Sequence, residues 1–180
     1  MRLYRVIPYD TGAAPTERGG VLFVPPGGGN RIDNIDLYDV LYLAATREGA
    51  IAEAFGRIPL WTPDTFVHGS GRAFALVDYE VPDGIALFQL DDVEALKSIE
   101  IKKPSTVVTR DRTKTHAWAR TIFETGRYVG VSWWSYYGPD WTIVGLWDRR
   151  ELTNVGTPMI LSAATPIVKE TAAVIVRQIA

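Results

Sequence analysis

The chain has 180 residues, a length that fits one domain with a sizeable hydrophobic core. Its composition, 47% hydrophobic and 22% charged, is typical of a folded protein, and a net charge of −2 provides no general attraction for nucleic acid or an anionic membrane. The absence of cysteine excludes disulfides, thiol catalysis and cysteine-based metal sites. Because the sequence has neither the apolar run of a signal peptide nor a membrane-spanning segment, we expect a cytoplasmic protein.

The N-terminal part of the chain predicts short strands separated by loops and followed by one helix. Three apolar runs predict strands: residues 3–8, 21–24 and 38–44. Two segments rich in glycine and proline predict loops between them: residues 10–20 and 25–30. Thr46 is then a good N-cap for a helix that continues to Phe55, and Gly56 is expected to end it.

The remainder of the chain predicts a similar mixture. Further strands are expected at four places: residues 73–79, 85–90, 128–134 and 141–147. The connecting segments include a PDG turn and a YYGPD turn: residues 82–84 and 136–140. Helices are expected at three places: residues 90–98, 115–125 and 166 onward. A strand is an alternative at the end of the last of these. Residues 59–71 predict a loop and 99–110 an extended segment. The whole predicts an α/β (α+β) fold, with a strand-rich mixed sheet as its core and flanking helices.

Several familiar active sites are absent. The two histidines, His68 and His116, are far apart and lack metal-ligand spacing, and no HExxH, GxSxG or GxxxxGK[ST] motif occurs. The GGGNR segment is not a GxGxxG fingerprint. The sequence therefore argues against metal catalysis, a Ser-His-Asp triad, P-loop phosphoryl transfer and a Rossmann site.

Arg31 is a candidate binding residue because it follows three glycines and an asparagine, where a ligand could approach the backbone closely. Its planar guanidinium group suits bidentate contact with a pyrophosphate. The alternative is a surface arginine that pairs with Asp33 or Asp36.

Glu53 and Tyr42 are candidates with equally ordinary alternatives. Glu53 borders the apolar side of the helix after Thr46, but it could instead be a solvated glutamate paired with Arg57. Tyr42 lies on an apolar strand, where a core tyrosine with one hydrogen bond is the simpler interpretation.

The segment GVSWWS at residues 130–135 could form another wall of the same site. Trp133 and Ser135 alternate along a predicted strand and therefore share one face. An aromatic ring beside a hydroxyl is a plausible ligand wall. The alternative is an ordinary strand with a tryptophan in the core.

Four segments follow one another in this order: GGGNRIDNID with Arg31, YDVLYLAAT with Tyr42, EGAIAEAF with Glu53 and GVSWWS with Ser135. Together they resemble the RES domain family, which is named for arginine, glutamate and serine. LYRV at residues 3–6 and TIVGLW at 142–147 also fit the family pattern. The family usually has Gly-Gly-Arg followed by an aromatic residue and often has tyrosine in place of Trp133. Here Asn30 intervenes before the arginine and Ile32 follows it, which affects the expected shape of the pocket. The resemblance covers residues 3–147 and makes residues 1–180 a single RES domain.

This resemblance implies an ADP-ribosyltransferase-like fold and NAD as the substrate, with no metal. RES proteins are typically toxins of bacterial type II toxin–antitoxin systems that deplete NAD as glycohydrolases or phosphorylases, and an Xre-like helix-turn-helix antitoxin blocks them. The implied roles are phosphate binding by Arg31, ring stacking by Tyr42 and Trp133, ribose binding by Glu53, and hydrogen bonding to the ribose or Glu53 by Ser135. The alternatives are a protein ADP-ribosyltransferase and a non-catalytic module that binds NAD or a protein. No contact with nucleic acid or membrane is expected, and a homo-oligomer is left open.

Overall fold

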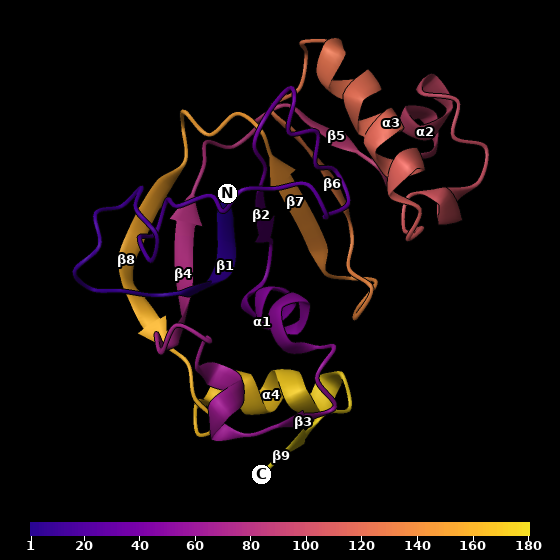
Figure 1. Ribbon diagram of the computed structural model, residues 1–180. Coiled ribbons are helices and arrows are strands. Elements are labelled where there is room, and N and C mark those ends of the chain that lie inside the picture. The colour runs from indigo at the N-terminus through magenta and orange to yellow at the C-terminus, as the bar shows by residue number, and fades with distance from the viewer.

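The computed structural model describes residues 1–180, and its centre is a seven-stranded mixed sheet (Figure 1). The strands of this sheet are β1 (Arg2–Pro8), β2 (Leu41–Ala44), β4 (Phe74–Glu80), β5 (Leu87–Gln89), β6 (Gly130–Trp134), β7 (Thr142–Leu146) and β8 (Thr153–Ile160). Their spatial order is β5-β6-β7-β2-β1-β4-β8; β5 and β6 are parallel, and the other neighbours are antiparallel. The predicted fold class is therefore confirmed.

The helices and a second, two-stranded sheet surround this core. The helices are α1 (Arg47–Phe55), α2 (Val93–Ser98), α3 (Arg112–Glu124) and α4 (Pro166–Val174), with 3-10 turns η1 (Pro63–Phe66) and η2 (Pro104–Thr106). The second sheet pairs β3 (Leu60–Trp61) in parallel with β9 (Gln178–Ile179). None of the helices combines the length and the hydropathy that crossing a bilayer requires.

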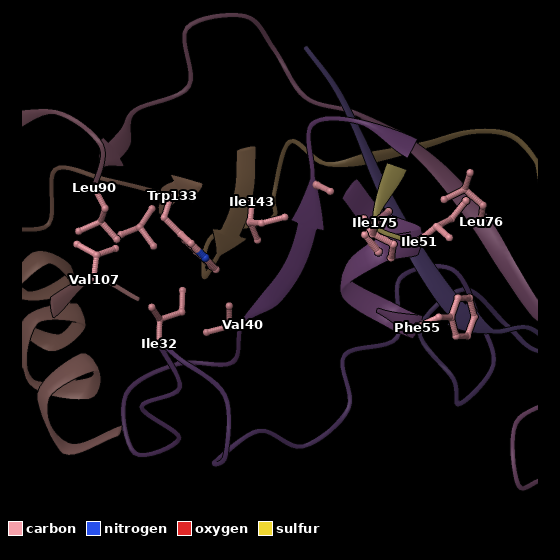
Figure 2. Packing of buried hydrophobic residues seen from close by; sticks show 14 of the residues in the cluster. Ile32, Val40, Ile51, Phe55, Leu76, Leu90, Val107, Trp133, Ile143 and Ile175 are labelled. Atoms are coloured by element: carbon pink, nitrogen blue, oxygen red, sulfur yellow. The ribbon is translucent and has the colours of Figure 1, made fainter. Parts of the chain in front are cut away.

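Alternating side chains of the sheet build two hydrophobic cores. The larger core contains side chains from all four helices and from the face of the sheet that carries Trp133 and Ile143. Figure 2 shows two groups within it, one around Ile32 and Trp133 and the other around Ile51 and Phe55. The smaller core lies on the residues of opposite alternation, such as Leu41 and Val144, and is partly covered by residues 21–24.

The local sequence explains how α1 is placed after β2. Thr46 adopts an extended conformation, and its hydroxyl accepts a hydrogen bond from the backbone N–H of Gly49 at 3.0 Å, as expected for an N-cap. Gly56 follows the helix where a side chain would not fit, because a Cβ atom there would lie 2.5 Å from the Tyr137 ring. These contacts fix the face of α1 that carries Glu53.

Gly145 in β7 also stands at a position where a side chain would not fit. A Cβ atom at this position would lie 2.3 Å from Cδ1 of Ile32. Ile32 is fully buried, so the glycine makes room for the residue that follows Arg31. The loop that carries Arg31 is thereby anchored in the larger core.

One expectation about the elements is wrong, and two features of the sheet were not predicted. Residues 21–24 form no strand; their apolar side chains cover the smaller core from a loop. β8 was not predicted, because it is a half-exposed edge strand interrupted by Gly156 and Pro158. The strands on either side of the PDG turn do not form a hairpin: β4 pairs with β1 and β8, whereas β5 pairs with β6 at the opposite edge.

Other boundaries differ in detail. The strand expected at residues 38–44 is confirmed only as β2. Residues 59–71, expected to be a loop, contain β3 and η1. Residues 99–110, expected to be extended, contain η2. α3 begins earlier than predicted, since Asp111 caps it by accepting from the N–H of Lys114. At the C-terminus both interpretations hold, because α4 is followed by β9.

Candidate active site

Glu53 and Ser135 meet although they are 82 positions apart in the sequence. The Ser135 hydroxyl donates a 2.6 Å hydrogen bond to Oε1 of Glu53 and accepts one of 3.1 Å from the N–H of Tyr137. Ser135 is 2% exposed, while Glu53 lies on the exposed side of α1. The carboxylate forms no ion pair with Arg57, so that alternative for Glu53 is wrong. The buried serine therefore holds an accessible carboxylate in one orientation.

Tyr42 and Asp33 hold the glycine loop in place. The Tyr42 hydroxyl donates to Oδ1 of Asp33 at 2.7 Å and accepts from the N–H of Ile32 at 3.1 Å. The other carboxylate oxygen of Asp33 accepts from the N–H groups of Gly28 at 2.7 Å and Asn30 at 2.8 Å. The sequence indicated Asp33 only as a partner for Arg31, whereas it organises the loop that carries Arg31.

The protonation states of this pair are set by burial and hydrogen bonding. Burial is the largest cause that raises the pKa of Tyr42, and the hydrogen bond to Asp33 raises it further. Burial also raises the pKa of Asp33, but the hydrogen bonds from Tyr42, Gly28 and Asn30 together lower it below its ordinary value. At neutral pH a protonated phenol therefore donates to an ionised carboxylate.

Arg31 is half-buried, and its contacts are to backbone oxygens. Its Nη1 donates to the carbonyl groups of Val107 and Thr109, the latter at 3.2 Å. Burial is the main cause that lowers its pKa, the neighbouring Arg112 lowers it further, and Glu53 raises it. The Glu53 carboxylate thus lies close enough to act on the Arg31 guanidinium group.

No carboxylate pairs with Arg31. Asp33 is engaged with the glycine loop, and Asp36 forms its ion pair with Arg120. The interpretation of Arg31 as a surface arginine paired with one of these aspartates is therefore wrong. The guanidinium group is therefore held by backbone carbonyl groups and takes part in no ion pair.

Trp133 lies behind these polar groups. It is 5% exposed and packs edge-on against Tyr42, with ring centroids 6.2 Å apart and an interplanar angle of 81°. The Trp133 ring belongs to the larger core, which agrees with the alternative of an ordinary strand with a tryptophan in the core. The same ring supports the half-buried Tyr42. Contact of either ring with a ligand remains a prediction.

Two further residues of the site were missed from the sequence. Tyr137 was assigned only to a turn, but its ring is half-buried and lies near Glu53. Burial is the largest cause that raises the pKa of the Tyr137 phenol, and the charge of Glu53 raises it further. Arg112 lies between the predicted extended segment and the predicted helix and was assigned to neither; it is the first residue of α3 and lies beside Arg31. The position of Tyr137 two residues after Ser135 was a usable signal; Arg112 had none.

The protein also has cavities of about 320 and 280 Å³ at other places. The first is lined by residues such as Ile85 and Leu152, and the second by residues such as Tyr9 and Asn154. Neither contains Arg31, and the chemistry of their linings is less specific than that of the cluster above. We therefore base the candidate site on the convergence of charged and hydroxyl groups.

Comparisons with known proteins agree with this architecture. A chain of the crystal structure of the M. tuberculosis MbcT–MbcA toxin–antitoxin complex superposes with a TM-score of 0.63 at 15% identity, covering 96% of this chain and 88% of that chain. Similarity at this identity shows that the fold is shared. No curated protein sequence matches significantly. The RES domain model matches residues 2–159, so the chain belongs to the RES domain family.

Proposed function

We propose that this protein is an NAD-consuming toxin that cleaves the bond between nicotinamide and ribose. The proposal rests on a carboxylate, Glu53, that Ser135 orients and that is near enough to Arg31 to raise the pKa of its guanidinium group, although Arg31 forms no ion pair. Family membership and the fold shared with a chain of a toxin–antitoxin complex support it.

The chemistry of NAD suits this small set of groups. Nicotinamide is a cationic leaving group in NAD, so its departure requires no general acid. As the bond breaks, the ribose acquires the character of an oxocarbenium ion, which a nearby carboxylate stabilises. In this proposal Glu53 contacts the ribose, Ser135 fixes the rotamer of Glu53, and Arg31 binds the phosphates.

Tyr42 and Trp133 would supply the aromatic side of the site. The Tyr42 hydroxyl is already bonded to Asp33 and Ile32, so its contribution to the ligand would come from the ring. Trp133 holds that ring from the core side. A neutral phenol leaves Glu53 as the negative charge beside the ribose.

A toxin of this kind requires an inhibitor, and we propose an Xre-like helix-turn-helix antitoxin as the partner. Arg31 is a half-buried positive group of the site that forms no ion pair, and an inhibitory segment of the antitoxin would cover it. A complex in which Arg31 stays open to solvent would contradict this mode of inhibition.

The proposal is tested by expressing the wild type and Glu53→Ala in bacteria and measuring growth and cellular NAD. We expect growth arrest with NAD loss for the wild type only, and rescue when a neighbouring helix-turn-helix gene is coexpressed. Unchanged NAD at full expression of soluble wild type would contradict the proposal and favour a non-catalytic binding module.

The acceptor is identified from the products of the purified enzyme with and without phosphate. Free ADP-ribose indicates water, a phosphorylated ADP-ribose indicates phosphate, and labelled protein from a lysate indicates protein ADP-ribosylation. We expect a small-molecule product. Radiolabel from NAD found only on protein would assign the chain to the transferases.

A further inference from the structure

Arg31 and Arg112 converge on one backbone oxygen. The carbonyl group of Thr109 accepts from Nη1 of Arg31 at 3.2 Å and from Nη1 of Arg112 at 3.5 Å. The Nε atom of Arg112 also donates to the carbonyl oxygen of Gly29 at 3.2 Å. Two guanidinium groups from distant segments therefore lie side by side at the edge of the glycine loop.

This pair of positive charges has no negative partner. Neither arginine takes part in any ion pair of the protein. The adjacent Asp111 caps α3 and pairs with Lys114 at 3.2 Å. Burial is the largest cause that lowers the pKa of Arg31, and Arg112 lowers it further, as expected for neighbouring like charges.

There is open space next to the pair. A Cβ atom built on Gly29 would meet no atom within 4 Å, and the nearest atom to one on Gly28 would be 4.0 Å away. Gly27, Gly28 and Gly29 are all exposed. The loop that contacts Arg112 therefore carries no side chain at residues 27–29 that could block an approaching anion.

We propose that Arg112 is a second anion-binding residue, which together with Arg31 binds the diphosphate of the substrate. This inference rests on the proposed function, because it requires that NAD occupies the site. A diphosphate carries one negative charge on each phosphate, and it matches two adjacent guanidinium groups better than a single phosphate does. Arg112 thereby selects for dinucleotides over ligands that end at the ribose.

The test compares two substrates that share the bond to be cleaved. NAD contains the diphosphate, and nicotinamide riboside lacks it. For Arg112→Ala we expect kcat/KM for NAD to fall about 10- to 100-fold, mainly through KM, because hydrogen bonds to a charged ligand are lost. The value for nicotinamide riboside should stay within about twofold of the wild type, and Arg112→Lys should retain part of the preference for NAD.

Arg110→Ala is the matched control, since Arg110 is an exposed arginine two positions away with no side-chain hydrogen bond or ion pair. It should leave both substrates unaffected. An equal loss on both substrates in Arg112→Ala would show that Arg112 only supports the loop and would overturn the inference. So would wild-type kinetics of Arg112→Ala on NAD, although the proposed function would then stand. If the wild type cleaves neither substrate, the proposed function fails and this inference fails with it.

Discussion

Replacing Ser135 with alanine tests the proposed link between the core and the catalytic carboxylate. The change removes the donor of the 2.6 Å hydrogen bond to Glu53 and the acceptor for the N–H of Tyr137. A hydrogen bond to a charged group makes a net contribution of about 1.5–3 kcal/mol. Because Glu53 is exposed and water can take the place of the hydroxyl, we expect the lower end, which corresponds to a decrease of about 10-fold in kcat.

The assay is the steady-state release of nicotinamide from NAD, with kcat and KM determined separately. If Ser135 positions Glu53 for the transition state, kcat falls while KM changes little. Ser132→Ala is the matched control, because Ser132 is also buried in β6 but has no bond to Glu53. Wild-type kcat in Ser135→Ala, or equal losses in both variants, would show that Ser135 does not position Glu53.

Two further substitutions test the support of the Arg31 loop. Asp33→Asn should lower the free energy of unfolding by about 1.5–3 kcal/mol in urea denaturation, because an ionised acceptor of three hydrogen bonds is lost. Since the folded pKa of Asp33 is lowered, this contribution is present above the unfolded pKa of about 4 and disappears as the pH falls below it; a difference that grows on acidification would contradict the assignment. Gly145→Ala should cost about 1–3 kcal/mol by thermal melting because its Cβ atom collides with Ile32, whereas Gly29→Ala, with open space around it, should not. Equal melting temperatures for Gly145→Ala and the wild type would show that the Ile32 anchor is unimportant.

Local signals in the sequence identified the elements that follow local rules. Thr46 marked the start of α1 because a threonine before an apolar helical segment commonly serves as its N-cap. Trp133 and Ser135, which alternate along the chain, are both buried, whereas Trp134 between them is half-buried. The order of the motifs around Arg31, Glu53 and Ser135 indicated the family, which the match over residues 2–159 confirms.

Features that depend on tertiary contacts could not be read in the same way. Residues 21–24 are apolar because they cover the smaller core, and periodicity cannot distinguish such a loop from a buried strand. β8 has too few buried residues to show alternation. The hydrogen bond between Tyr42 and Asp33 arises only when the glycine loop packs against β2. Arg112 comes to lie beside Arg31 only when the same loop packs against the N-terminal end of α3.

Release of nicotinamide by the purified protein shows whether Glu53 serves NAD cleavage at this site. Wild type and Glu53→Gln are incubated with NAD, and nicotinamide and the remaining NAD are quantified by chromatography. We predict one nicotinamide released for each NAD lost by the wild type, and a rate at least about 100-fold lower for Glu53→Gln. Equal rates for the two proteins, or no nicotinamide release by the wild type, would contradict the account.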